Sequence, residues 1–196
     1  MPAKCTLRDT GVRQGDGRHV VNKPKTRRLK IIGPDEIEAL YARPHFSNEE
    51  RDTYFALTPP EKALLGQLRT IPSRIYFVLQ LGYFKARHEF FIFSIHDVED
   101  DARYVQQAYS LDFELMDLEI TKVTRLKQQG MILDLLTHRY CDASERQKLA
   151  VKAPQLARVD SQPIYIFREL IQHLAHNRLI APGYSSMQDI VGQALT

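Results

Sequence analysis

The longest apolar stretch of the chain is residues 74–93, RIYFVLQLGYFKARHEFFIF, in which only Gln80 and Gly82 interrupt the first run of large apolar side chains. A helix that is apolar on every face is buried among other helices. Basic side chains, which suit the C-terminal end of a helix dipole, close this run: Lys85, Arg87 and His88. The pattern predicts a central buried helix that begins at Pro72. Residues 90–93 are predicted to form a tight, buried connection after it.

Capping patterns predict several other helices in the first half of the chain. Pro34 suits the first turn of a helix. Two capping boxes, in which Ser or Thr is followed three residues later by Glu, begin at Ser47 and Thr58. Apolar residues then recur at helical spacing from Val98 to Tyr109. The predicted helices are residues 34–41, 47–57, 58–70 and 98–109.

The second half contains four further predicted helices. The first lies within ITKVTRLKQQGMILDLL, and its buried face is expected to consist of Val123, Leu126, Gly130 and Leu133. A capping box at Asp142 opens the second, which Pro154 is expected to end or bend. Ser161 is expected to cap a helix that extends to residue 177. The last helix is expected to start at Ser185, after a Pro-Gly turn.

These elements predict an all-α fold with two helical bundle modules. Each half ends in a long helix, a turn and a second helix, the order that a helix-turn-helix or homeodomain-like module requires. The halves share this order at an offset of roughly 85 to 90 residues, which either an internal repeat or chance similarity between amphipathic helices explains. The predicted parts are a disordered basic tail (1–28), a first module (29–109), an acidic linker (110–120) and a second module (121–196).

Five segments of the chain carry a family resemblance: LQLGYFKARHEFF, TRLKQQ, RQKL, PIYIFREL and LIAPGYSSMQDIVGQAL. In this order they resemble the N-terminal region of the large replicative transposases of the Tn-three family, from about Leu29 to Thr196. The resemblance implies an all-helical region that binds the terminal inverted repeats of a transposon. It also implies that the acidic catalytic triad lies in a later domain, absent from this chain, so we expect no catalysis here. Residues 110–120 depart from the glycine- or proline-containing loop of typical members.

The net charge of +3 is unevenly distributed. Residues 1–30 contain nine Lys or Arg and two Asp, whereas the remaining residues contain 18 basic and 22 acidic side chains. The predicted helical part therefore has a net charge of −4. Bulk positive charge is no argument for nucleic acid in such a body, and any DNA-binding surface must be a local one, separated from the carboxylates.

Candidate DNA contacts fall into three groups. Arg125 and Lys127 can neutralise phosphates, and the glutamines that follow can form paired hydrogen bonds with adenine edges. The last helix begins with small polar side chains that can approach phosphate or a base edge. Arg69 and Arg74, which flank the start of the central helix, can clamp a DNA backbone, and Lys85 and Arg87 are further cations at its other end. The residues expected to contact double-stranded DNA are Arg69, Arg74, Lys85, Arg87, Thr124, Arg125, Lys127, Gln128, Gln129, Tyr184, Ser185, Ser186 and Gln188.

Other interpretations of these residues stay open. The basic groups also suit the solvated face of an ordinary helix, and Arg69 or Arg74 can pair with Glu61 or another carboxylate. The acidic start of the helix after Asp97 would be repelled by phosphates, so either its later part, from Arg103, faces DNA or the helix faces a protein. The alternative functions are a helical interaction or dimerisation module and a truncated transposase that inhibits a full-length one.

No motif for catalysis or cofactor binding occurs in the sequence. A phosphate-binding loop and a nucleophile elbow are missing, and the acidic run DVEDDAR is typical of a charged helix start rather than a metal site. We expect no cofactor and no metal. The two cysteines fit a reducing compartment, and no signal peptide or membrane span is recognisable. We expect a cytoplasmic bacterial protein associated with the nucleoid, whose partners are double-stranded DNA and a full-length transposase or a second copy of itself.

Overall fold

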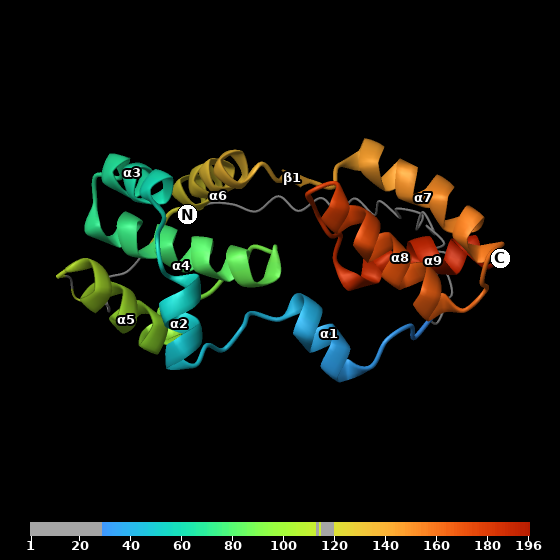
Figure 1. Ribbon diagram of the computed structural model, residues 1–196, viewed down its shortest axis with the longest axis horizontal. Coiled ribbons are helices and arrows are strands. Elements are labelled where there is room, and N and C mark those ends of the chain that lie inside the picture. The colour runs from blue at the N-terminus through green and yellow to red at the C-terminus, as the bar shows by residue number, and fades with distance from the viewer. Residues whose placement is uncertain (1–28, 113, 115–119) are drawn as a thin grey trace, which may run out of the picture.

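A computed structural model describes residues 29–112, 114 and 120–196 of the chain, and Figure 1 shows their arrangement. The predicted tail, residues 1–28, and most of the predicted linker lie outside the described residues. The described helices are α1 (Pro34–Tyr41), α2 (Asn48–Tyr54), α3 (Pro59–Gln67), α4 (Ile71–Arg87), the 3-10 helix η1 (His96–Val98), α5 (Glu99–Tyr109), α6 (Lys122–Leu136), α7 (Ala143–Ala157), α8 (Pro163–His176) and α9 (Tyr184–Ala194). The predicted all-α class is confirmed.

Side-chain caps set the starts of several helices. The Ser47 hydroxyl accepts from the Glu50 amide at 3.3 Å, and the Glu50 carboxylate accepts from the Ser47 amide at 2.8 Å. The Asp142 carboxylate caps α7 by accepting from the Glu145 amide at 2.9 Å. The predicted capping box at Ser47 therefore begins α2, and at Asp142 the N-cap bond alone begins α7. Gln162, rather than the predicted Ser161, occupies the N-cap of α8.

Three predicted boundaries and connections differ in the structure. α2 ends at Tyr54, before the predicted residue 57, because Phe55 leaves the helix to enter the core. Pro154 lies inside α7, which continues to Ala157. The connection after α4 is not buried throughout, since the Ile92 side chain is 79% exposed.

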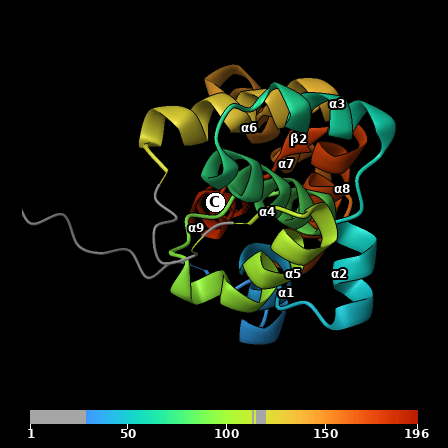
Figure 2. The same ribbon diagram turned by 90° about the vertical axis from the view of Figure 1, so that its left-hand side faces the viewer.

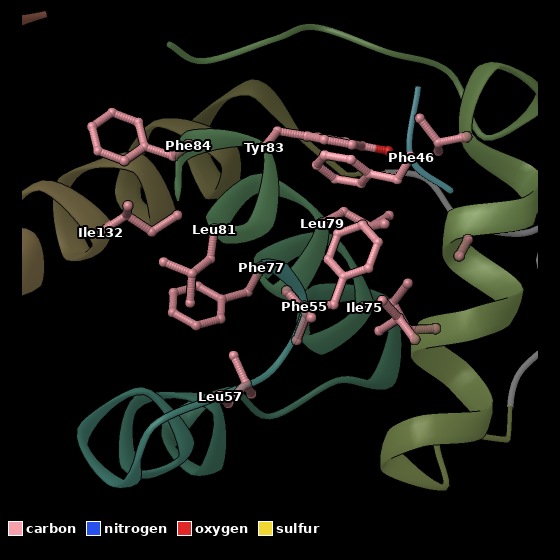
Figure 3. Close-up of a cluster of buried hydrophobic side chains, with 14 of the residues drawn as sticks. Phe46, Phe55, Leu57, Ile75, Phe77, Leu79, Leu81, Tyr83, Phe84 and Ile132 are labelled. Carbon is pink, nitrogen blue, oxygen red and sulfur yellow. The ribbon is translucent and has the colours of Figure 1, made fainter. Parts of the chain in front are cut away.

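The first hydrophobic core surrounds α4. Every residue from Ile75 to Phe84 is buried, as the apolar run predicted. Figure 3 shows Phe55 and Leu57 of the α2–α3 segment, together with Ile132 of α6, around the α4 side chains. Val98 and the buried face of α5 close another side. α4 is therefore the central helix of this bundle.

The second core joins α7, α8 and α9 with the N-terminal segment. Ile32 is buried in it, and Ile37 and Tyr41 of α1 pack against it. In Figure 1, α2 to α6 lie on one side of the molecule and α7 to α9 on the other. Figure 2 shows the first group nearer the viewer, with α6 above α4.

The two cores do not coincide with the predicted modules, residues 29–109 and 121–196. α1 belongs to the second core because Ile37 and Tyr41 pack against it. α6 belongs to the first core because Ile132 and Leu133 pack on α4 and its neighbours. The first helix of each predicted module thus packs in the core formed mainly by the other module, which short-range patterns could not show.

α6 buries only part of its predicted face, the part that contains Leu133. Val123 and Leu126 are 77% and 52% exposed, whereas Gln128 and Gln129 are buried with Ile132 and Leu133. Apolar residues occur around much of the helix, so their spacing did not select a face. Gln128 donates hydrogen bonds to Ser73 of α4, and this contact sets the orientation of α6.

A short parallel strand pair lies between the two cores. β1 (Arg139–Tyr140) pairs with β2 (Leu179–Ile180) in the register Arg139 with Leu179. Leu179 is buried in the second core and Ile180 in the first, so the strand pair connects the two bundles. No strand was predicted there, because two residues are too few to show an alternating pattern.

Candidate nucleic-acid interface

A groove of about 890 Å³ lies where the N-terminal ends of α4 and α6 meet, beside the end of α3. Four of the predicted DNA-contacting residues line it: Arg69, Thr124, Lys127 and Gln128. Among the described residues that line the groove, none is an Asp or Glu. The groove is thus a local, positively charged surface in a body that is otherwise slightly acidic.

The two helices that meet at the groove are capped by threonines. The Thr70 hydroxyl accepts from the Ser73 amide at 3.3 Å, and the Thr121 hydroxyl accepts from the Thr124 amide at 3.2 Å. Both caps line the groove. The positive ends of two helix dipoles therefore lie beside the basic side chains, a combination that favours an anion such as phosphate.

The side chains of Arg69 and Lys127 are exposed, and neither forms an ion pair with a residue that the structure describes. The predicted alternative, pairing of Arg69 with Glu61, is not found, because Glu61 pairs with Lys85. Two cations without protein partners are able to exchange their counterions for phosphates.

Arg74 and Arg125 serve mainly to position neighbouring groups. The Arg74 guanidinium donates to the Leu68 carbonyl at 2.8 Å, which fixes the turn before α4 at the edge of the groove. Arg125 lies close enough to Tyr76 to oppose the rise that burial causes in the pKa of that phenol. Both arginines are half-buried.

Gln128 and Gln129 are not presented to a base edge. The Gln128 amide nitrogen donates to both the carbonyl and the hydroxyl oxygen of Ser73, each at 2.8 Å. The Gln129 carbonyl accepts from the Tyr140 hydroxyl at 3.1 Å. Their exposed fractions are 1% and 7%. The predicted reading of adenine by these side chains is therefore corrected: they hold α6 against its neighbours.

Lys85 and Arg87 lie at the opposite end of α4, roughly 24 Å along the helix axis from the groove. The Lys85 ammonium donates to the Glu61 carboxylate and to the Ala56 carbonyl, each at 2.8 Å. Arg87 borders a cavity between the two cores. The structure thus separates these two cations from the other predicted contacts, and Lys85 is already neutralised.

The start of α9 is partly covered by the N-terminal segment. The Tyr184 hydroxyl accepts from the amides of Ile31 and Ile32 at 3.1 and 3.3 Å. The Gln188 amide nitrogen donates to the Leu29 carbonyl at 2.7 Å. Of the four residues predicted to contact DNA from this helix, Ser185 alone is exposed, and the other three are partly buried. Tyr184 and Gln188 instead anchor the segment that precedes α1.

The acidic residues near η1 have structural partners. The buried Asp101 carboxylate accepts from Arg51 Nε at 2.7 Å and from the Tyr83 hydroxyl at 2.6 Å. Asp97 accepts from the Ser94 amide and hydroxyl. Within the described part of the chain, no group of three potential metal ligands comes together. None of the described helices combines the length and the apolarity needed to cross a membrane.

Sequence comparison finds one family model that matches the chain, over residues 31–194, and its description is domain of unknown function (DUF4158). A comparison with curated proteins gave no match. The matched residues span both cores and the groove.

Proposed function

The chain belongs to the DUF4158 family, a domain of unknown function, and we propose that it binds double-stranded DNA through the groove between α4 and α6. The observation that carries this proposal is the grouping of Arg69 and Lys127, both unpaired among the described residues, beside two helix N-termini in a groove whose described lining contains no Asp or Glu. Counterion release from such a surface favours a polyanion over a protein with mixed charges.

The resemblance to the Tn-three family transposases supports a more specific proposal. In this proposal the bound DNA is a terminal inverted repeat of a transposon, and the chain acts as the end-binding N-terminal part of a transposase. Phosphate contacts at the groove position the protein, and Ser185 and Ser186 of α9 supply contacts from the second core. No residue of this chain is assigned a catalytic role.

Single substitutions in the groove test this proposal. We expect Arg69→Ala and Lys127→Ala each to weaken duplex binding at low salt and to reduce the slope of log affinity against log salt by about 0.9 per lost phosphate contact. Fluorescence anisotropy with a labelled duplex over a salt series measures both quantities. Lys148→Ala is the matched control, since Lys148 is an exposed cation on α7 that pairs with Glu145.

Equal slopes for the groove variants and for Lys148→Ala would contradict the proposed contact. A groove variant with unchanged slope but lower affinity would mean that the side chain acts by shape rather than by charge.

A second candidate function, a protein-interaction module, is supported by the exposed apolar residues Val123 and Leu126 on α6. These side chains lie on the helix that also contributes Lys127. Val123→Ser with Leu126→Ser should leave DNA binding unchanged under the main proposal. Loss of a self-association seen by analytical ultracentrifugation in that variant would favour the interaction module.

A further inference from the structure

A second cavity, of about 230 Å³, lies between the two cores and is distinct from the groove. Its walls come from α1, the C-terminal end of α4, α8 and the segments next to β1 and β2. Most of the wall is aliphatic, with Ile171 and Leu174 of α8 on one side. A volume of roughly 150 Å³ suffices to hold a benzene molecule. The cavity is therefore large enough for a ring with a short substituent.

Two polar groups in this cavity lack a cationic partner among the described residues, although the Glu89 carboxylate accepts a hydrogen bond from the Phe90 backbone. The Tyr41 hydroxyl is buried and forms no hydrogen bond. The Glu89 carboxylate forms no ion pair with any described residue, although Arg87 borders the same cavity. Burial raises the pKa of both Glu89 and Tyr41, and the charge of Glu89 raises the pKa of Tyr41 further. The two groups are therefore neighbours that do not bond each other.

Aromatic rings form another part of the wall. His88 and His138 stack with ring centroids 5.2 Å apart and an angle of 21° between their planes. Burial is the main cause that lowers the pKa of His88, and His138 lowers it further, so the uncharged imidazole is favoured and His88 is a poor partner for the Glu89 carboxylate. A carboxylate, an unbonded hydroxyl and aromatic surface together favour an organic cation.

We propose that this cavity binds a small organic amine, whose ammonium group lies between Glu89 and Tyr41 and whose apolar body lies against Ile171 and Leu174. The ammonium donates to the carboxylate and to the phenol oxygen, which satisfies both groups at once. The Glu89 carboxylate repels an anion, and a neutral molecule would leave the charge of Glu89 unpaired. Because the walls come from both cores, a bound amine also holds the two bundles together.

Benzylamine is a suitable probe, with benzyl alcohol and benzoate as neutral and anionic molecules of the same shape. We expect benzylamine to bind the full chain with roughly millimolar affinity, the range of a ligand this small. In ¹H–¹⁵N spectra, it should shift the amide signals of Glu89 and Ala175 in a saturable manner. The alcohol should bind at least about tenfold more weakly, and benzoate should give no saturable shift.

Two conservative substitutions locate the ammonium group. Glu89→Gln removes the charge and Tyr41→Phe removes the hydroxyl, and each should weaken benzylamine binding by about tenfold or more. Glu38→Gln is the control, because Glu38 is exposed on the same helix as Tyr41. Equal affinity for benzylamine and benzyl alcohol in the unmodified chain would overturn the proposal. So would unchanged benzylamine affinity in Glu89→Gln.

Discussion

At the scale of single residues, Gly82 is the point where the α2–α3 segment lies closest to α4. A Cβ atom built on Gly82 would lie 2.5 Å from Cε1 of Phe55, well inside van der Waals contact. The sequence showed Gly82 only as an interruption of an apolar run. A glycine is needed here because the Phe55 ring lies against this position. Phe55 is 27 positions earlier in the chain, so no local pattern reveals the contact.

We predict that Gly82→Ala destabilises the protein. Overpacking against Phe55 costs about 1–3 kcal/mol, which exceeds the roughly 1 kcal/mol that alanine gains in helix propensity. Gly130→Ala is the matched control, because Gly130 lies in the middle of α6 with nothing within 4 Å of an added Cβ. Urea denaturation should show a lower free energy of unfolding for Gly82→Ala and a higher one for Gly130→Ala. Two substitutions that both stabilise would contradict the close contact.

Ser110 supports a second prediction at this scale. It ends α5 in the left-handed conformation, with φ of 52°, which costs a non-glycine residue about 1–2 kcal/mol. Ser110→Gly should raise the free energy of unfolding by roughly 0.5–1 kcal/mol, after the greater chain entropy of glycine is subtracted. Thermal or urea unfolding measures this change. A loss of stability would mean that the serine hydroxyl makes a contact worth more than the strain.

At the scale of secondary-structure elements, the Glu61–Lys85 ion pair joins α3 to α4. The Glu61 side chain is buried, and it also accepts from the Thr58 amide at 2.7 Å in the capping box. One carboxylate thus starts α3 and fixes its position on α4. Lys85 was predicted to contact DNA. The sequence does not show that the capping residue Glu61 is buried beside it.

We predict that Lys85→Ala lowers the free energy of unfolding by about 3 kcal/mol, because it leaves the buried Glu61 carboxylate without a cation. Adding Glu61→Gln should restore part of the loss, and a double-mutant cycle in urea measures the coupling. Strictly additive effects of the two substitutions would show that the pair contributes nothing beyond its separate side chains.

Helix starts could be predicted from the sequence, whereas helix faces could be predicted only in part. Caps such as Ser47 and Asp142 act on backbone amides three residues away, so a local pattern contains the whole interaction. The orientation of α6 depends instead on the hydrogen bonds from Gln128 to Ser73, which is 55 positions away. Glutamine is usually a surface residue. Gln128 and Gln129 were therefore predicted to contact DNA, although they lie on the buried face of α6.

At the scale of the whole molecule, the two cores are assembled from segments that are not consecutive. The N-terminal residues 29–41 pack on α8 and α9, and α6 packs on α4. The sequence predicted two groups of helices but assigned α1 and α6 to the wrong neighbours. The sequence predicted the residues of the groove only one by one. Arg69 and Lys127 come together because α6 packs on α4.

The junction between the cores should make stability depend on pH through Glu89. Burial raises the pKa of this carboxyl above its value in the unfolded chain, about 4.3. Its protonated form is favoured by folding, so stability is highest below the unfolded pKa and falls as pH rises through the folded pKa. Glu89→Gln should remove this part of the decline in urea midpoints between pH 4 and 7, roughly the range above the unfolded pKa. A variant with the same decline as the unmodified chain would show that Glu89 is solvated.

We propose that this chain recognises the ends of a transposon, and a comparison of its affinities for two duplexes decides whether it does. The unmodified chain is titrated against a duplex carrying a terminal inverted repeat and against a scrambled duplex, each over a range of salt concentrations. The proposal predicts tighter binding to the repeat, by about 10³-fold or more at physiological salt, and a steep loss of affinity for both duplexes as salt rises. Equal affinity for the two duplexes, or no binding to either, would contradict it.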